Sequence, residues 1–418
     1  MPQIKSLASR RFTADRGLCH NFFRAPTRRL GEQTVMTNFG RLALAVLISV
    51  ALSRCAVKTY PRQVSAREKA ASNVAYAVDN LGAVAHHYLL AAGPGYDLSR
   101  QRVQVPDYNF YLDPAFRQAA AFYQAPDRMP EVKQEKLQET SAYTVWLLSW
   151  PSLYRPVNPA FAPLYQTYTE DQTAYALYYQ AKAPNHAALV VSHGWTGGDV
   201  RKGAKSNRLE AFVRLGFDAA LIQQPYHGLR RPAGSRFSGE YFLSGEVSRL
   251  NEAMAQAVMD ARSLAQWLRR DHAVVGARGG SLGGIVTLMA AAAEPELDFA
   301  VAWVPPNALG EIAEVTPLAP YIRKGFRQSG LDRETVQRVL GVTSPANYPP
   351  AIPKEDVLIL AGMGDHFVPP DQPAAIWESW GHPPIFWFAG GHLINCQLQQ
   401  SQQVEADFLR ARLPAEAK

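Results

Sequence analysis

The chain has 418 residues, of which 47% are hydrophobic and 19% are charged. This composition is that of an ordinary globular protein, and it excludes both a disordered chain and a polytopic membrane protein. The length suffices for one large catalytic domain with additions.

The formal net charge of +7 is concentrated near the N-terminus. Residues 1–41 contain eight lysines and arginines but only two acids, so they hold +6 of that charge. The rest of the chain is nearly neutral, which argues against electrostatic binding of a nucleic acid. We therefore expect no nucleic-acid partner.

An apolar run from Leu42 to Leu52 follows this basic stretch. The run is shorter than the roughly 20 residues of a membrane-spanning helix, and its length is typical of a signal-peptide core. The next residues, Ser53, Arg54 and Cys55, resemble the end of a bacterial lipoprotein box, although Arg54 stands where that pattern has a small residue. Residues 1–60 are thus predicted to be a leader that exports the protein or attaches it to a membrane, rather than part of a cytoplasmic enzyme. Lipidation of Cys55 and an uncleaved anchor or buried helix remain open alternatives.

Cysteine is sparse beyond this leader. Cys19 and Cys55 lie within it, so Cys396 alone remains and no internal disulfide framework can form. The chain contains neither Cys-x-x-Cys nor His-Glu-x-x-His, the spacings of common zinc sites. We expect neither a metal nor an organic cofactor.

Residues 61–160 are predicted to form a helical extension. Ser65 and Glu68 have the spacing of a capping box, in which each side chain bonds a free backbone N–H of the first helical turn. The helix that begins there should end at Gly93-Pro94-Gly95. Asp113-Pro114 predicts a second helix start, with the aspartate as the cap.

Residues 161–418 alternate short apolar runs with amphipathic segments, a pattern that indicates parallel strands and crossover helices. Residues 164–168 and 173–179 are predicted to form an opening hairpin. Residues 250–268 have helical periodicity. Further buried strands are expected at residues 188–191, 219–222, 274–275, 299–304, 357–360 and 385–388. The fold class is therefore α/β, with a mostly parallel central sheet flanked by helices.

The stretch between the sixth and seventh of these strands is too long for a simple crossover. Residues 305–350 within it are either a lid over the site or an ordinary crossover helix with a decorated loop.

The segment that indicates chemistry is Gly279-x-Ser281-x-Gly283, which lies between a predicted strand and a predicted helix. In this context Gly-x-Ser-x-Gly forms a sharp, strained turn that presents the serine at the carboxyl edge of an α/β-hydrolase sheet. The glycines are needed because side chains there would collide with the adjoining strand and helix. A phosphate-binding turn is disfavoured, because no P-loop lysine follows and the Gly-x-Gly-x-x-Gly spacing is absent.

A serine hydroxyl needs an imidazole to accept its proton and a carboxylate to orient that imidazole. Asp365 follows the predicted strand at 357–360, and His392 follows the last predicted strand. Both residues therefore lie where open α/β sheets place their sites, in the chain order serine, acid, histidine. His366 and Asp371 fit these roles less well, because the first follows the wrong strand and the second lies farther from its strand end.

Two backbone amides are expected to form an oxyanion hole. Leu282 N–H lies at the start of the helix behind the serine. His193-Gly194-Trp195, after the strand at 188–191, resembles the His-Gly stretch of many esterases and lipases, with Trp195 N–H as the second donor. His193 is then expected to brace this loop and to contribute to the substrate site.

The segment Pro225-Tyr226-His227-Gly228-Leu229-Arg230-Arg231-Pro232, with the later serine motif, resembles a branch of the α/β-hydrolase superfamily related to abhydrolase domain-containing protein 18. The resemblance extends over about residues 164–409 and implies an acyl hydrolase, with lipids among its substrates. Tyr226, His227, Arg230 and Arg231 are candidate substrate-binding residues. The two arginines would hold an anionic group, or they belong to a solvated or salt-bridged loop.

These observations predict a serine hydrolase that cleaves a carboxylic ester, with Ser281 as nucleophile, His392 as base and Asp365 as its partner. Two alternatives remain open: a non-catalytic binding or scaffold protein with this fold, and an amidase or peptidase that uses the same residues.

Overall fold

The computed structural model describes residues 61–86, 108–183, 185–316 and 320–414. All of these belong to one compact unit, Ala51–Lys418. The predicted leader with Cys55 and the predicted helix end at Gly93-Pro94-Gly95 lie outside the described residues. Among the described helices, none has the length and apolar character needed to cross a bilayer.

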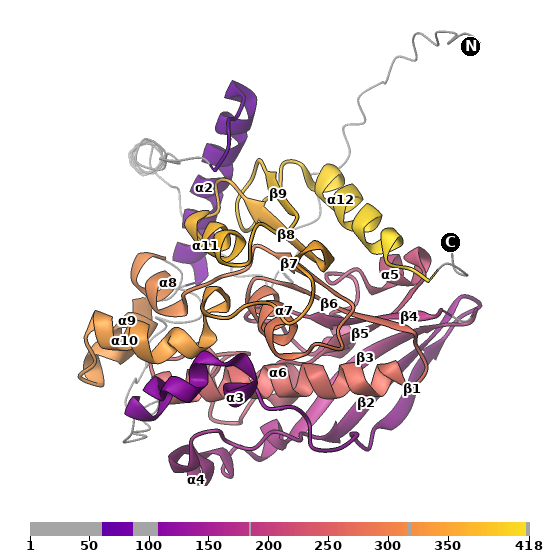
Figure 1. Ribbon diagram of the computed structural model, residues 1–418, viewed down its shortest axis with the longest axis horizontal. Helices are drawn as coiled ribbons and strands as arrows, with labels where there is room; N and C mark the ends of the chain where they lie inside the picture. The colour runs from indigo at the N-terminus through magenta and orange to yellow at the C-terminus, as the bar shows by residue number, and fades with distance from the viewer. Residues whose placement is uncertain (1–60, 87–107, 184, 317–319, 415–418) are drawn as a thin grey trace, which may run out of the picture. The chain divides into compact units, whose positions relative to one another are not determined.

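A nine-stranded sheet forms the centre of this unit (Figure 1). Its spatial order is β1-β2-β3-β5-β4-β6-β7-β8-β9, so the strands from β4 onwards follow chain order except for the exchange of β4 and β5. The strands are β1 (Lys133–Glu139), β2 (Tyr143–Pro151), β3 (Thr173–Ala181), β4 (Ala187–Ser192), β5 (Phe217–Ile222), β6 (Val274–Gly280), β7 (Phe299–Trp303), β8 (Val357–Gly362) and β9 (Ile385–Phe388).

The first three strands and the β3–β5 pair are antiparallel, and all pairs from β5 to β9 are parallel. Parallel strands end at the same edge of the sheet, so the loops after β4, β6, β8 and β9 meet there. The predicted α/β class with a mostly parallel sheet is confirmed, and so is every strand expected from residue 188 onwards.

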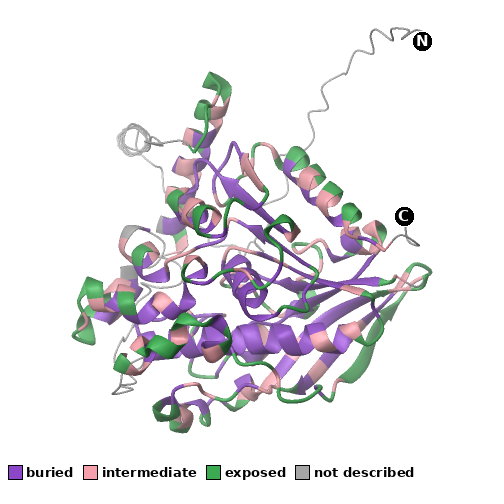
Figure 2. Cartoon of the chain, in the orientation of Figure 1, coloured by how far each residue is buried: buried purple, intermediate pink, exposed green. Residues whose placement is uncertain are grey.

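Helices cover both faces of the sheet. The α-helices of the described residues are α2 (Ala66–His86), α3 (Ala119–Phe122), α4 (Ala162–Tyr165), α5 (Leu209–Leu215), α6 (Val247–Arg269), α7 (Leu282–Ala293), α8 (Leu309–Val315), α9 (Pro320–Gln328), α10 (Arg333–Val339), α11 (Asp371–Ser379) and α12 (Leu398–Ala411). Alternate residues of the strands pack with α6 and α7 in one apolar cluster and with α5 and α12 in a second. Burial is deepest along α6, α7 and the central strands (Figure 2).

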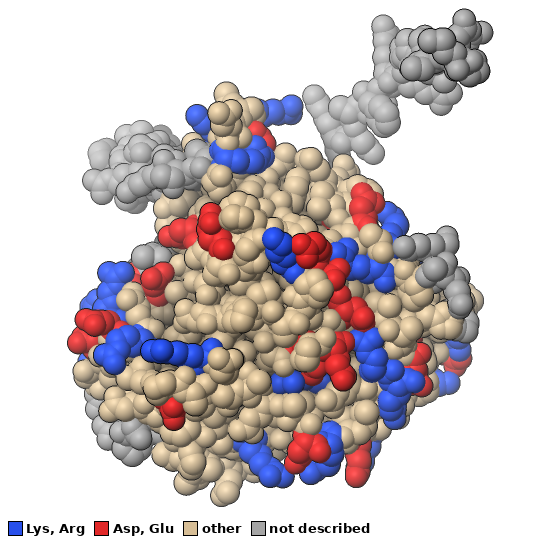
Figure 3. Space-filling model, viewed as in Figure 1, with Lys and Arg blue, Asp and Glu red and all other residues tan. Residues whose placement is uncertain are grey.

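The edge strand β1 contrasts with this interior. All seven of its residues are exposed, and four of them are charged. Charged side chains on an edge strand discourage pairing with another sheet. On the face shown in Figure 3, lysines and arginines lie among aspartates and glutamates.

Two expectations about the N-terminal half are wrong. Residues 133–151 form β1 and β2 of the central sheet, so the helical interpretation of residues 61–160 fails there. The predicted hairpin at 164–168 and 173–179 is also absent: residues 162–165 form α4, and β3 pairs with β2 instead. Asn158 caps a short 3₁₀ helix there by accepting from Ala160 N–H at 3.0 Å, and Pro163 near the start of α4 favours a helix over a strand.

The predicted helix starts are confirmed. Ser65 Oγ accepts from Glu68 N–H at 3.2 Å, and Glu68 Oε2 accepts from Ser65 N–H at 2.9 Å, which is a capping box at the start of α2. Asp113 accepts from Ala115 N–H at 2.8 Å and caps the 3₁₀ helix Pro114–Arg117.

The stretch between β7 and β8 contains α8, α9 and α10. The Tyr321 ring of α9 stacks on the Trp195 ring of the loop after β4, with 6.5 Å between the ring centroids. This insertion therefore touches the loop predicted to supply an oxyanion donor. Its role as a lid stays a prediction.

Candidate active site

Ser281 occupies a strained turn between β6 and α7. Its backbone has φ 55° and ψ −120°, a region that non-glycine residues rarely adopt. A Cβ added to Gly279 would lie 2.0 Å from Gly283 O, and one added to Gly283 would lie 2.1 Å from Ser192 O. No side chain fits at either position, as the sequence predicted, so the two glycines are what permits this turn.

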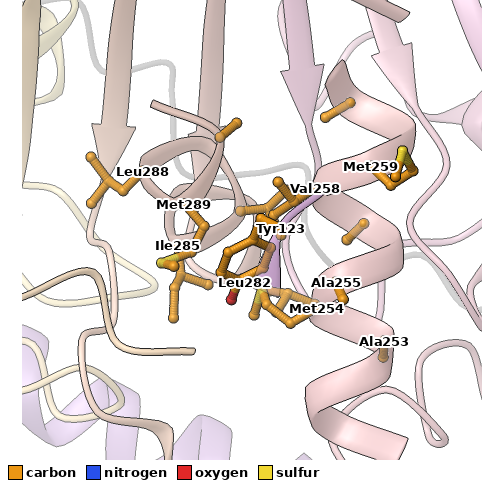
Figure 4. Packing of buried hydrophobic residues seen from close by; sticks show 14 of the residues in the cluster. Tyr123, Ala253, Met254, Ala255, Val258, Met259, Leu282, Ile285, Leu288 and Met289 are labelled. Carbon is orange, nitrogen blue, oxygen red and sulfur yellow. The ribbon is translucent and has the colours of Figure 1, made fainter. Parts of the chain in front are cut away.

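Helix α7 holds the serine on a rigid support. All twelve of its residues are buried. Its Leu282, Ile285 and Met289 lie in one apolar cluster with Met254 and Val258 of α6 (Figure 4). Because the helix behind Ser281 is packed on all sides, the position of the hydroxyl is set by the core rather than by a mobile loop.

The structure brings Ser281, Asp365 and His392 together. His392 Nε2 lies 2.9 Å from Ser281 Oγ, and His392 Nδ1 lies 2.7 Å from Asp365 Oδ2. A carboxylate accepts a proton from Nδ1, so the Nε2 lone pair faces the serine hydroxyl. The three residues form a continuous hydrogen-bonded relay that leads from the carboxylate to the hydroxyl.

Asp365 is fixed by its own loop. Its Oδ1 accepts from Phe367 N–H at 2.9 Å and from Val368 N–H at 2.8 Å, and the residue is 2% exposed. One carboxylate oxygen is thus held by the backbone, which leaves the other directed at His392.

The pKa of His392 is raised from its ordinary value of 6.5. Burial by itself would lower this pKa, but the charge of Asp365, its hydrogen bond to the ring and the charge of Asp79 outweigh burial. The imidazole is therefore a stronger base than a histidine in water, which suits acceptance of a proton from a hydroxyl.

Asp79 of α2 is a second carboxylate beside this relay, and the sequence patterns did not identify it. Its Oδ2 accepts from His392 N–H at 2.8 Å and from His366 N–H at 3.1 Å, and its Oδ1 accepts from Leu393 N–H at 2.9 Å. The sequence feature that could have identified Asp79 is its position as a single acid on a helix face of small residues. That buried face consists of Ser72, Ala75, Asp79 and Ala83.

The two amides expected to form an oxyanion hole border the serine. Leu282 N–H belongs to the residue after Ser281, and a Cβ built on Gly194, next to Trp195, would lie 3.6 Å from Ser281 Cβ. Within the described residues neither Leu282 N–H nor Trp195 N–H donates a hydrogen bond. Neither amide is therefore used by the described part of the chain.

His193 braces the loop before Trp195. Its Nε2 accepts from Gln224 N–H at 3.1 Å, so its Nδ1 is protonated and donates to Gly194 O at 2.8 Å. Burial lowers the pKa of His193 to about 4, so the ring is neutral near pH 7. His193 is only 4% exposed, and these contacts support a bracing role rather than direct contact with a substrate.

The candidate substrate residues after β5 are mostly closed off. Tyr226, His227 and Arg230 are at most 1% exposed. Arg230 Nε lies 2.9 Å from Asp171 Oδ1, and Arg230 Nη1 lies 2.8 Å from Asp260 Oδ2. For Arg230 the structure therefore contradicts the alternative in which it holds an anionic substrate group and supports the salt-bridged alternative, because its guanidinium is already paired within the core.

Arg231, in contrast, is exposed. Its role in substrate binding stays a prediction. No cluster of three or more histidine, cysteine, aspartate or glutamate side chains suited to a metal occurs in the described part of the chain. Cys396 is free and exposed.

No protein-family model matches the chain. The uncharacterized protein Rv2627c of Mycobacterium tuberculosis is 30% identical over 285 residues, which are 65% of this chain and 65% of the relative. The chain thus matches less than two thirds of the length of that relative. The uncharacterized protein YdjC of Bacillus subtilis is 25% identical over 95 residues, 22% of this chain and 81% of the relative.

Solved structures resemble the chain over a larger share. Acetyl xylan esterase 1 from Thermoanaerobacterium sp. superposes with a TM-score of 0.53 at 18% identity, over 72% of this chain and 94% of the esterase. The acetyl xylan esterase from Paenibacillus sp. R4 gives a TM-score of 0.52 at 16% identity, over 77% of this chain and 100% of the esterase. At such identities the likeness concerns architecture: the chain has the α/β-hydrolase fold.

Proposed function

We propose that this protein is a serine hydrolase that cleaves a carboxylic ester through an acyl-enzyme intermediate. The observation that supports this best is the relay in which Ser281 Oγ, His392 and Asp365 are joined by hydrogen bonds of 2.9 and 2.7 Å at the carboxyl edge of the sheet. A hydroxyl on a strained turn, next to a basic imidazole and unused amides, is arranged for nucleophilic attack.

In the proposed reaction, Ser281 Oγ attacks the ester carbonyl while its proton moves to His392 Nε2. Asp365 holds the ring and stabilises the imidazolium that forms. The amides of Leu282 and Trp195 donate to the oxyanion. His392 then gives the proton to the departing alcohol, and a water molecule, deprotonated by the same imidazole, releases the acid and restores the serine.

We also propose a class of ester for the substrate. Both superposed solved structures are acetyl xylan esterases by name, which favours an oxygen ester over an amide. The likeness to the abhydrolase domain-containing protein 18 branch favours a lipid acyl ester. Since Arg230 is closed within the core, Arg231 is the arginine of that motif that we propose for contact with an anionic substrate group. The basic and apolar leader supports export or membrane attachment.

A fluorophosphonate probe tests the nucleophile directly, because it modifies an activated serine and leaves ordinary hydroxyls alone. The full chain should be labelled, and Ser281→Ala should abolish labelling. Ser206→Ala, at an exposed serine, is the matched control and should label as the wild type. Absence of labelling in the folded wild type would contradict the proposal and favour the scaffold alternative.

The substrate class is tested with p-nitrophenyl esters of two to sixteen carbons and matching p-nitroanilides. We expect turnover of esters and much slower turnover of anilides. A preference for anilides would replace the esterase by an amidase or peptidase. A rise in kcat/KM with chain length would support the lipid ester.

A further inference from the structure

Helix α2 packs directly on both loops that hold the acid and the histidine (Figure 1). A Cβ added to Gly364, one residue before Asp365, would lie 2.2 Å from Ser72 O. A Cβ added to Gly391, one residue before His392, would lie 2.5 Å from Asp79 Oδ2. The helix therefore approaches each loop at a glycine that adjoins a member of the relay.

Asp79 uses this close approach to join the two loops. One carboxylate accepts three backbone N–H groups: His366 from the loop after β8, and His392 and Leu393 from the loop after β9. The two loops also bond each other directly, since Gly364 N–H donates to Gly390 O at 2.7 Å, and Asp79 adds bonds at His392 itself and at the residue after Asp365. Asp79 itself is fully buried.

Loss of this acceptor would leave three backbone N–H groups without their present partner. The loops would move to regain hydrogen bonds. Such a movement changes the distance between His392 and Ser281, and a displacement of about 1 Å can reduce a rate by about 10²-fold.

We infer that Asp79 is a positioning residue that sets the spacing between the acid loop and the histidine loop. This inference rests on the proposed function. It assigns the N-terminal helix a task that its sequence did not reveal.

The charge of Asp79 adds a second, separable effect. The titratable groups that face it are Asp365 and His366 on the loop after β8 and His392 on the loop after β9. A negative charge at Asp79 favours the protonated imidazole and is one of the causes that raise the pKa of His392. Removal of that charge should move the acid limb of the activity profile to lower pH.

The test uses the full chain with Asp79→Asn, which keeps the size of the side chain but removes the charge and replaces one acceptor oxygen by a donor. Ser72→Ala is the matched control, since Ser72 lies two turns earlier on the same buried face and its Oγ has no partner among the described residues. Circular dichroism and thermal melting check folding. Steady-state kinetics on a p-nitrophenyl ester, the fluorophosphonate labelling rate and the pH profile are then measured.

For Asp79→Asn we expect kcat to fall by about 10- to 100-fold, KM to change little, labelling to slow in parallel, and the acid limb to shift to lower pH. Ser72→Ala should match the wild type in all four. A role of Asp79 in folding alone would lower the melting temperature without the shift of the acid limb. Wild-type kcat with an unshifted limb in folded Asp79→Asn overturns the inference.

Asp79→Glu separates position from charge and serves if Asp79→Asn does not fold. Its carboxylate is displaced by one methylene, so we expect a reduced kcat with the acid limb unchanged. Wild-type kcat in folded Asp79→Glu overturns the inference. Failure of the proposed function is distinguishable, because the wild type itself would then neither label nor turn over esters.

Discussion

Two groups of histidine, aspartate and hydroxyl lie at opposite edges of the same sheet. At the carboxyl edge, His392 joins Asp365 and Ser281 at 2.7 and 2.9 Å. At the amino edge, His272 precedes β6 and bonds Asp218 at the start of β5 at 3.1 Å. Tyr178 OH donates to the same Asp218 oxygen at 2.8 Å.

The two groups differ in the hydrogen-bond partners of the imidazole nitrogens. His272 Nδ1 lies 2.8 Å from Leu268 O near the end of α6, so both of its ring nitrogens are occupied within the protein. His392 Nε2 faces only a serine hydroxyl. Burial and the neighbouring Asp218 also raise the pKa of Tyr178 far above its ordinary range, which keeps that hydroxyl neutral. Residue types alone therefore do not define a candidate catalytic site. The features that do are an imidazole nitrogen that faces a hydroxyl, and a strand end beside backbone amides that donate no hydrogen bond.

The sharpest way to break this comparison is to substitute the aspartate of each group. Asp365→Asn should lower kcat by about 10⁴-fold, because an amide favours the wrong tautomer of the histidine. Asp218→Asn, the matched control, should lower stability and leave kcat unchanged. Kinetics on a p-nitrophenyl ester and urea unfolding measure both effects. Equal losses of kcat in the two variants would contradict the claim that only the group at the carboxyl edge acts in catalysis.

Arg230 and Arg231 test whether burial also distinguishes a structural residue from a substrate-binding one at the carboxyl edge. Arg230→Met should destabilise the fold by about 3–5 kcal/mol, because the buried carboxyl groups of Asp171 and Asp260 would lose their charged partner. Arg231→Met is the control at an exposed neighbour and should change stability by less than about 0.5 kcal/mol. Urea unfolding at pH 7 provides the measurement. A stable Arg230→Met variant with a changed KM would restore the substrate role that its burial contradicts.

The carboxyl edge was predictable because its residues are defined by strand ends, and strand ends can be located along the chain. Ser281, Asp365 and His392 each follow a short strand that begins with an apolar run, and parallel strands bring such positions together. The glycines at 279 and 283 were predictable for the same reason, since the turn is local.

Contacts between distant segments were not predictable in this way. Residues 143–151 alternate between the two apolar clusters of the sheet, with Val145 and Leu147 in one and Leu148 and Trp150 in the other. This alternation is the period-2 pattern of a strand, and it lies within the region predicted to be helical. The partners of Arg230 come from before β3 and from the middle of α6, and Asp79 lies 287 residues before His366 and 313 residues before His392. No local pattern specifies which buried acid meets which distant amide or guanidinium.

The pH dependence of activity also distinguishes the two histidines, because only His392, whose Nε2 faces the serine hydroxyl, should control it. His392 must be neutral to accept a proton, and its pKa is raised. The logarithm of kcat/KM should therefore fall with unit slope as pH decreases, with a midpoint above about 6.5 and a loss of about 100-fold two pH units below that midpoint. His272→Gln should leave this profile unchanged. A rate that stays constant down to about pH 4 would contradict the assignment of the base.

His272 should instead control a small part of the stability. Burial lowers its pKa, but the hydrogen bonds to Asp218 and Leu268 and the charge of Asp218 raise it above 6.5 overall. A group with a raised folded pKa stabilises the fold fully below its unfolded pKa, and that contribution is lost as pH rises through the folded pKa. His272→Gln should therefore lower the free energy of unfolding by about 1–2 kcal/mol at pH 5.5, the upper end of the range for a partly buried protonated histidine at a helix C-terminus, and by much less at pH 9. Urea unfolding of wild type and variant at the two pH values measures the gap. An equal loss of unfolding free energy at both pH values would show that His272 stabilises the protein by packing rather than by its charge. The contrast between a histidine whose charge serves catalysis and one whose charge serves stability would then fail for His272.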